Sequence, residues 1–159
     1  MKDFNNRKVA IAKKIDQILK TIFSWAISSK GREIKCPKSI LFVDLHLIGD
    51  IVLLSALLKA VKSSYPEARI GLVAGSWSKD ILSDLQLVDE FYFYSAPWVN
   101  KNKNCGYFKL AYLIWRLRSR NWSWACDVRG DLRNILLLKL SGSKRRFGFN
   151  FTGGEWLLT

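Results

Sequence analysis

The residues 39–69, SILFVDLHLIGDIVLLSALLKAVKSSYPEAR, decide the fold of this chain. Their first part, residues 40–43, is a continuous run of β-favouring apolar side chains, which predicts a strand buried on both faces. From Ile51 onwards apolar residues recur at helical spacing, until Pro66, whose ring is incompatible with the interior of a helix. The stretch therefore predicts a strand, a short loop and a helix in succession.

The loop between this strand and this helix carries the first candidate functional residues. Asp50 is expected at or next to the helix N-cap, where a carboxylate accepts backbone N–H bonds and faces the positive end of the helix dipole. An acid in this place stays ionised at neutral pH, which suits a cap and equally suits a general base. Gly49 permits close approach of a ligand to the backbone, and His46, the only histidine, lies in the same loop.

The rest of the chain alternates strand and helix patterns. Further strands are expected at residues 70–74, 90–94, 124–128 and 147–149, and helices at 80–85, 107–120 and 132–140. In the helix at 107–120, helical spacing is carried by Phe108, Ala111, Tyr112 and Trp115. Strands that alternate with helices imply right-handed crossovers, so the predicted fold class is α/β, with a parallel sheet covered by helices on both faces.

Residues 1–38 differ in composition from the sheet domain expected at 39–159. One helical face of this extension is apolar and is formed by Ile11, Ile15, Ile18, Leu19, Ile22, Trp25 and Ala26. Two interpretations stay open: an amphipathic helix packed on protein, or a helix in the membrane interface whose basic residues meet anionic lipid. A secretory signal is not expected, because Lys14 and Lys20 interrupt the apolar core that such a signal needs.

The charge and the cysteines restrict the possible partners and compartment. Lys+Arg 26 against Asp+Glu 13 gives a net charge of +13, so we expect an anionic partner such as phosphorylated glycolipid, an anionic membrane surface or nucleic acid. Cys36, Cys105 and Cys126 have no CxxC spacing and indicate reduced, packing cysteines of a cytoplasmic protein. No metal-ligand spacing occurs, no GxGxxG follows the first strand, and no apolar run is long enough to span a bilayer.

Two stretches resemble a known enzyme family. The run ILFVDLHLIGDIVLLSALLKAVKSSYPEARIGLV, residues 40–73, is similar to the opening unit of the lipopolysaccharide heptosyltransferases, inverting glycosyltransferases of family 9 with two Rossmann-like halves (the GT-B fold). The run ACDVRGDLRNILLLKLSGSKRRFGFNFTGGEWLLT, residues 125–159, resembles the end of that family's N-terminal half. The resemblance implies that this chain is the acceptor-binding half, that the C-terminal donor-binding half is missing, and that the chain alone is inactive.

The resemblance also implies a chemistry. The family's motif has an acid in a Gly-Asp pair after the first strand, taken as the general base, and Asp50 matches it. The family uses no metal or other cofactor, and its donor, a nucleotide-sugar such as ADP-heptose, is a substrate. The implied acceptor is a lipid-linked, phosphorylated oligosaccharide of the lipopolysaccharide core. The implied location is the cytoplasm, peripheral to the inner face of the cytoplasmic membrane.

Several further residues are candidates for binding the acceptor beside Gly49 and His46. Arg129, at the end of the strand at 124–128, could bind a phosphate or carboxylate bidentately, and Lys144 and Arg145 in a basic turn could do likewise. Asp131 is expected mainly as the N-cap of the next helix.

Two other functions stay open. One is a member of the same family that transfers another sugar, because donor identity is decided in the missing half. The other is a basic α/β binding module for nucleic acid or another polyanion, which is not an enzyme. The charge would allow this module, but no aromatic-basic RNA motif or helix-turn-helix signature accompanies it.

Overall fold

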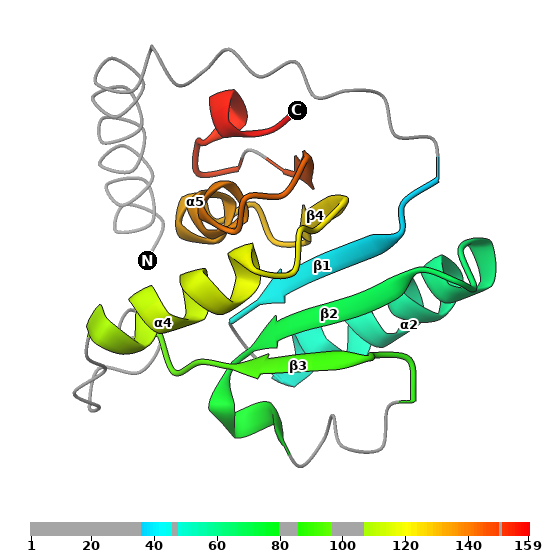
Figure 1. Ribbon diagram of the computed structural model, residues 1–159. Coiled ribbons are helices and arrows are strands. Elements are labelled where there is room, and N and C mark those ends of the chain that lie inside the picture. Colours follow the sequence, from blue (N-terminus) through cyan, green and yellow to red (C-terminus); the bar gives the residue numbers. More distant parts are fainter. Residues whose placement is uncertain (1–35, 46–47, 80–85, 97–106, 150) are drawn as a thin grey trace.

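The computed structural model describes residues 36–45, 48–79, 86–96, 107–149 and 151–159 (Figure 1). The expected N-terminal helix, His46, Cys105 and the expected helix at 80–85 lie outside these residues. The first strand begins at Ser39, where the sheet domain is expected to start.

Five parallel strands form one sheet in the order β3-β2-β1-β4-β5. Their bounds are Ser39–Asp44 for β1, Arg69–Ala74 for β2, Glu90–Phe93 for β3, Trp124–Asp127 for β4 and Arg145–Gly148 for β5. The central strand β1 is buried along its whole length, as its continuous apolar run predicts. The order reverses between β1 and β4, and open parallel sheets bind their ligands at the carboxyl side of such a switch point.

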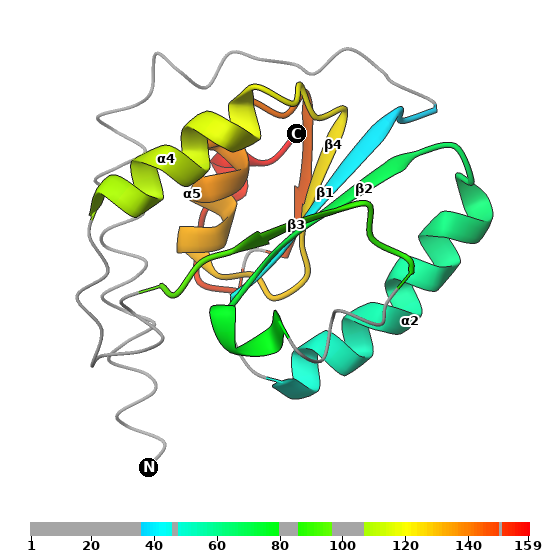
Figure 2. The ribbon, with the colours of Figure 1, turned by 60° about the horizontal axis from the view of Figure 1, so that its bottom comes forward.

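Helices cover both faces of the sheet, which confirms the predicted α/β class. Helix α2, Ile48–Ser64, lies on one face, and α4, Tyr107–Arg118, and α5, Leu132–Leu140, lie on the other (Figure 2). Two short 3-10 helices, η2 at Ser76–Ser78 and η3 at Glu155–Leu157, complete the described elements.

Alternation along the strands divides the core into two layers. Leu41 and Val43 of β1 point into a cluster with Leu117 and Trp122, on the side of α4 and α5. Their neighbours along β1 point into the cluster beneath α2, whose buried members are Ile40, Phe42, Ile51, Leu54, Leu58, Ala68, Ile70, Leu72 and Ala74. The sheet is therefore held from both sides by apolar packing, and its strand ends are fixed in place.

The structure corrects two details of the helices. Helix α2 begins at Ile48, earlier than the first periodic residue Ile51, so Asp50 lies inside the first turn and is not the cap. In α4 the buried face is formed by Leu113 and Leu117, with Leu110 and Ile114 packed beside them. The helical spacing that the sequence shows in Phe108, Ala111, Tyr112 and Trp115 belongs to the opposite, exposed face. Both faces of α4 are apolar, and the aliphatic side chains pack on the sheet.

Candidate active site at the switch point of the sheet

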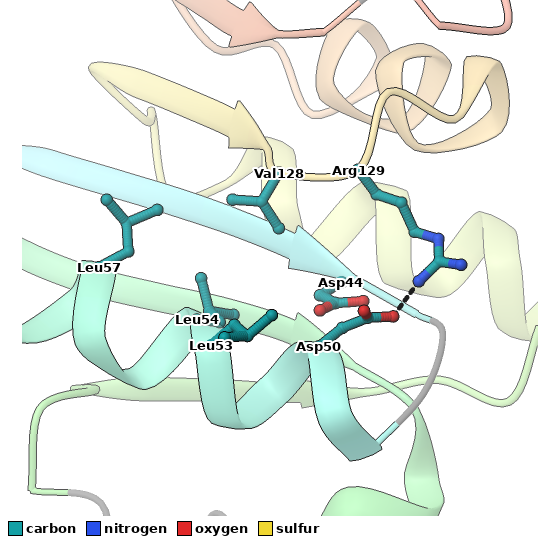
Figure 3. A pocket seen from close by; sticks show the side chains of 7 residues that line it. All are labelled: Asp44, Asp50, Leu53, Leu54, Leu57, Val128 and Arg129. Carbon is teal, nitrogen blue, oxygen red and sulfur yellow. Dashed lines mark hydrogen bonds and ion pairs between the residues drawn. The ribbon is translucent and has the colours of Figure 1, made fainter.

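A pocket of about 160 Å³ opens at the carboxyl ends of β1 and β4, where the strand order reverses (Figure 3). Asp50 reaches it from the first turn of α2, and Arg129 reaches it from the turn that follows β4. Asp44 and Val128 contribute from the strand ends, and the apolar wall is formed by Leu53, Leu54 and Leu57.

Asp50 and Arg129 meet in an ion pair across this pocket. The Nη1 atom of Arg129 donates to Oδ2 of Asp50, and the two side chains are 39% and 32% exposed, respectively. Asp50 also lies in the first turn of α2, where the helix dipole favours negative charge. The mouth of the pocket therefore offers one paired carboxylate and guanidinium to a ligand that arrives from solvent.

Buried Asp127 determines where Arg129 lies. As the last residue of β4 it accepts the backbone N–H groups of Arg129 at 3.3 Å, of Gly130 at 2.6 Å and of Asp131 at 3.1 Å. The amide of Asn134 donates to it at 3.0 Å. Burial raises the pKa of Asp127, and these hydrogen bonds oppose that rise. The carboxylate thus fixes the backbone of the turn by hydrogen bonds, so Asp127 is a positioning residue of the candidate site.

The same turn starts helix α5. Gly130 has a φ of +73°, a conformation that favours glycine and allows a tight turn between β4 and α5. Asp131 is the N-cap of α5 and accepts the backbone N–H of Arg133 at 2.9 Å, which confirms the predicted cap. Thr152 closes the turn, since its hydroxyl accepts the N–H of Leu132 at 2.9 Å and donates to the Gly130 carbonyl at 2.9 Å.

The structure brings together only part of the predicted set of site residues. Gly49 stands beside Asp50 in the first turn of α2, and a Cβ added to it would meet no other atom within 4 Å. Arg145 pairs with Trp124, the first residue of β4, so Lys144 and Arg145 lie at the amino edge of the sheet, opposite the pocket. His46 lies outside the described residues. The binding roles of all these residues stay predictions.

Asp44 is a pocket residue that the sequence analysis did not assign to the site. It is fully buried and ends β1 at the switch point. The available signal was an acid that terminates a strand whose other interior residues are all apolar. A carboxyl group is almost never fully buried unless it is paired, so Asp44 is a further candidate residue of this pocket.

In the described part of the chain, three other kinds of site are relevant: a metal centre, a membrane span and a reactive cysteine. There, no group of three or more His, Cys, Asp or Glu residues could hold a metal ion, and no helix is long and apolar enough to cross a membrane. Cys36 and Cys126 are both free cysteines. Burial, with the nearby charge of Asp127, raises the pKa of the Cys126 thiol to about 12, so this thiol is not a nucleophile at neutral pH.

Solved glycosyltransferase structures share this fold. The E. coli ADP-heptose lipopolysaccharide heptosyltransferase II superposes with a TM-score of 0.62 at 21% sequence identity, over 76% of this chain and 33% of that chain. A glycosyl transferase of family 9 from Veillonella parvula gives 0.62 at 14% identity, over 76% of this chain and 34% of that one. The E. coli heptosyltransferase WaaC with ADP superposes with a TM-score of 0.59 at 17% sequence identity, over 69% of this chain and 35% of that chain.

These similarities are structural. No family model matches the sequence, and no curated protein matches it. The chain spans about one third of the length of the solved chains that it matches. The predicted fold class is thereby confirmed: this chain has the Rossmann-like α/β fold that forms part of the heptosyltransferase and family 9 glycosyltransferase structures.

Proposed function

We propose that this chain is the acceptor-binding half of an inverting, metal-independent glycosyltransferase that moves heptose or a related sugar from a nucleotide-sugar to a lipopolysaccharide core acceptor. One observation carries the proposal. Asp50 and Arg129, both singled out in the sequence, meet in a pocket at the switch point of a sheet that has the fold of heptosyltransferase structures.

Asp50 acts as the general base in this reaction. The acceptor hydroxyl oxygen attacks the anomeric carbon of the donor, and the Asp50 carboxylate takes the hydroxyl proton as the new C–O bond forms. The bond to the nucleotide diphosphate breaks at the opposite side, and its electron pair leaves with the diphosphate. Because the acceptor oxygen enters on the face opposite to the departing diphosphate, the anomeric configuration is inverted. Positive charge and helix N-termini of a donor-binding half stabilise the departing diphosphate.

Arg129 connects acceptor binding to the availability of this base. In the free chain its guanidinium is held by Asp50. A phosphate on the acceptor offers the guanidinium a bidentate partner and competes for it. As Arg129 turns to the phosphate, the Asp50 carboxylate becomes free to accept a proton. An acceptor that lacks the phosphate therefore reacts more slowly and also binds more weakly.

The net charge of +13 supports a second candidate, a binding module for nucleic acid or another polyanion. The two candidates differ in where the anion binds. The glycosyltransferase requires the pocket at Arg129, whereas a polyanion would follow basic side chains over the surface without regard to the pocket.

Calorimetric titration of the chain distinguishes these functions. We expect weak, saturable binding of a phosphorylated glycolipid acceptor, roughly tenfold weaker in Arg129→Gln because a charge-assisted bidentate contact is lost. Lys59→Gln is the control, since it removes one positive charge from the exposed side of α2. We expect no saturable binding of ADP-heptose, and a clear one-site isotherm would contradict the assignment of the donor to another domain. Oligonucleotide binding that is tight and indifferent to Arg129→Gln would favour the second candidate.

A further inference from the structure

The outward side of α4 is aromatic and exposed. Phe108, Tyr112 and Trp115 are 90%, 58% and 65% exposed, and their spacing of four and three residues places them on one face of the helix. The rings of Tyr112 and Trp115 lie 5.9 Å apart and 30° from parallel. We call these three residues the α4 aromatic face.

Within the described residues, the core of the domain does not include this face. The opposite side of α4 buries Leu113 and Leu117 against the sheet, with Leu110 and Ile114 beside them. Single apolar residues on a surface are ordinary, but three large aromatic side chains in one stripe mark an interaction surface. Tryptophan, tyrosine and phenylalanine are also the residues that anchor helices at the boundary between lipid headgroups and acyl chains.

The charges on α4 indicate what binds there. The helix, YFKLAYLIWRLR, contains no acid, and its cations are Lys109, Arg116 and Arg118. At 3.6 residues per turn, Lys109 and Arg116 flank one side of the aromatic face and Arg118 flanks the other. The guanidinium of Arg116 lies 6.0 Å from the centre of the Tyr112 ring and 5.0 Å from that of Tyr92 in β3, so it stands between the aromatic face and the sheet. An aromatic stripe bordered by cations matches a surface that is apolar within and negatively charged at its boundary.

We propose that the α4 aromatic face docks on an anionic phospholipid bilayer. Lipid phosphates satisfy the flanking cations while the aromatic side chains enter the interface. A second copy of this chain fits less well, because it would bring further positive charge against Lys109, Arg116 and Arg118. The segment at residues 1–35 is also basic, with Lys13, Lys14 and Lys20 beside its apolar positions, and fits less well for the same reason.

The orientation that results brings the candidate site to the bilayer. The strands are parallel and α4 runs back from the carboxyl end of β3 towards the start of β4, so the first turn of α4 lies near the carboxyl edge of the sheet (Figure 1). The pocket of Asp50 and Arg129 opens at that same edge. A lipid-linked acceptor would thus reach the pocket along the docked edge. This last step rests on the proposed function, whereas the docking itself does not.

The test uses the full chain and vesicles that contain no glycolipid, so its result is independent of acceptor binding. Co-sedimentation at low salt is measured with phosphatidylcholine vesicles, with and without phosphatidylglycerol. We expect binding to the anionic vesicles, and a loss of roughly tenfold or more in the partition coefficient for Phe108→Ser/Tyr112→Ser/Trp115→Ser. Phe149→Ser/Phe151→Ser is the matched control, because it removes another stacked pair of exposed aromatic rings.

A second variant tests the charges independently of the aromatic side chains. Lys109→Gln/Arg116→Gln/Arg118→Gln should bind anionic vesicles at least tenfold more weakly and show a smaller salt dependence than the wild-type chain, because each basic residue near the surface adds attraction to anionic lipid. Both variants should keep the wild-type melting temperature, since all the substituted side chains are exposed.

Two results would overturn the proposal: a wild-type chain that does not bind anionic vesicles, and an aromatic variant whose vesicle binding is unchanged. If binding is unchanged and the variant has a smaller mass in sedimentation equilibrium, a second copy of the chain occupies the face. If binding is unchanged and the variant has a lowered melting temperature, the chain covers α4 with its own residues.

Discussion

Asp50 is a partner in an ion pair and the proposed general base, and mutation can separate the two roles. Its ion pair with Arg129 is about one third exposed on each side, so the pair contributes only about 0–1 kcal/mol to stability. Position in the first turn of α2 adds a similar modest amount through the helix dipole. Loss of the negative charge therefore leaves the fold nearly as stable, while the capacity to take a proton disappears.

Asp50→Asn should lower the rate of sugar transfer by about 10²–10⁴-fold in a protein that carries this chain with a donor-binding half, because general-base catalysis contributes about that much. Melting temperature and donor affinity should hardly change, which separates a chemical role from a structural one. Transfer from ADP-heptose is the measurement. Asp131→Asn is the control, because asparagine also caps a helix. Near-normal turnover of the Asp50 variant, or its unfolding, would remove Asp50 as the base.

In strand β2, a tryptophan ring occupies the space where a side chain of Gly71 would lie. The fully buried Trp122 lies over Gly71, and a Cβ on Gly71 would stand 2.3 Å from the ring. The ring is held from other sides by Tyr92, at 6.4 Å between ring centres, and by the guanidinium of Arg69 at 5.0 Å. The tryptophan therefore cannot move aside without loss of these contacts.

Gly71→Ala should lower the melting temperature by roughly 2–12 °C, because overpacking costs about 1–3 kcal/mol and a domain of this size shifts by about 2–4 °C per kcal/mol. Gly49→Ala is the matched control. Its Cβ would enter open space in the first turn of a helix, so its melting temperature should stay equal or rise. Thermal unfolding followed by circular dichroism measures both. Equal melting temperatures for Gly71→Ala and the wild-type chain would show that Trp122 has room to move.

The elements also show how far periodicity predicts. Strand β1 was predictable because a continuous apolar run places apolar side chains on both faces of a strand, which is typical of a strand buried on both faces. Helix α4 was predictable as a helix, but its buried face was not, because aliphatic and aromatic stripes have the same spacing. Helix α2 begins at Ile48, before the first periodic residue Ile51, because Ile48 and Gly49 do not extend the apolar pattern that starts at Ile51.

At the scale of the whole molecule, strand order decides which candidate residues share a site. Asp50 and Arg129 are far apart in the sequence and meet because β4 lies beside β1. Lys144 has the same charge as Arg129 and is nearer to it in sequence than Asp50 is, yet Lys144 precedes β5 whereas Arg129 follows β4, so the two lie at opposite edges of the parallel sheet. Composition and spacing could nominate all three residues. Only the direction and order of the strands assign two of them to one edge of the sheet.

We expect the α/β domain to fold without the N-terminal segment, because helices α2, α4 and α5 pack apolar side chains on the two faces of its sheet. Deletion of residues 1–30 should leave the melting temperature nearly unchanged and weaken binding to anionic vesicles, because basic residues and Trp25 are lost. Co-sedimentation at low salt, where surface attraction is strongest, is the measurement. Unchanged binding would show that the segment has no role at the membrane.

The central place of β1 has a consequence for biosynthesis. Its register with β2 is complete soon after β2 is made, but its other neighbour begins at Trp124, 80 residues after β1 ends at Asp44. At 5–20 residues per second the ribosome takes roughly 4–16 s to supply that partner. Throughout this interval the most apolar strand of the protein has an open hydrogen-bonding edge, which is a template for pairing with other nascent chains. The expected vulnerability of this protein is therefore to aggregation during translation, at the very strand that is best protected once the chain is complete.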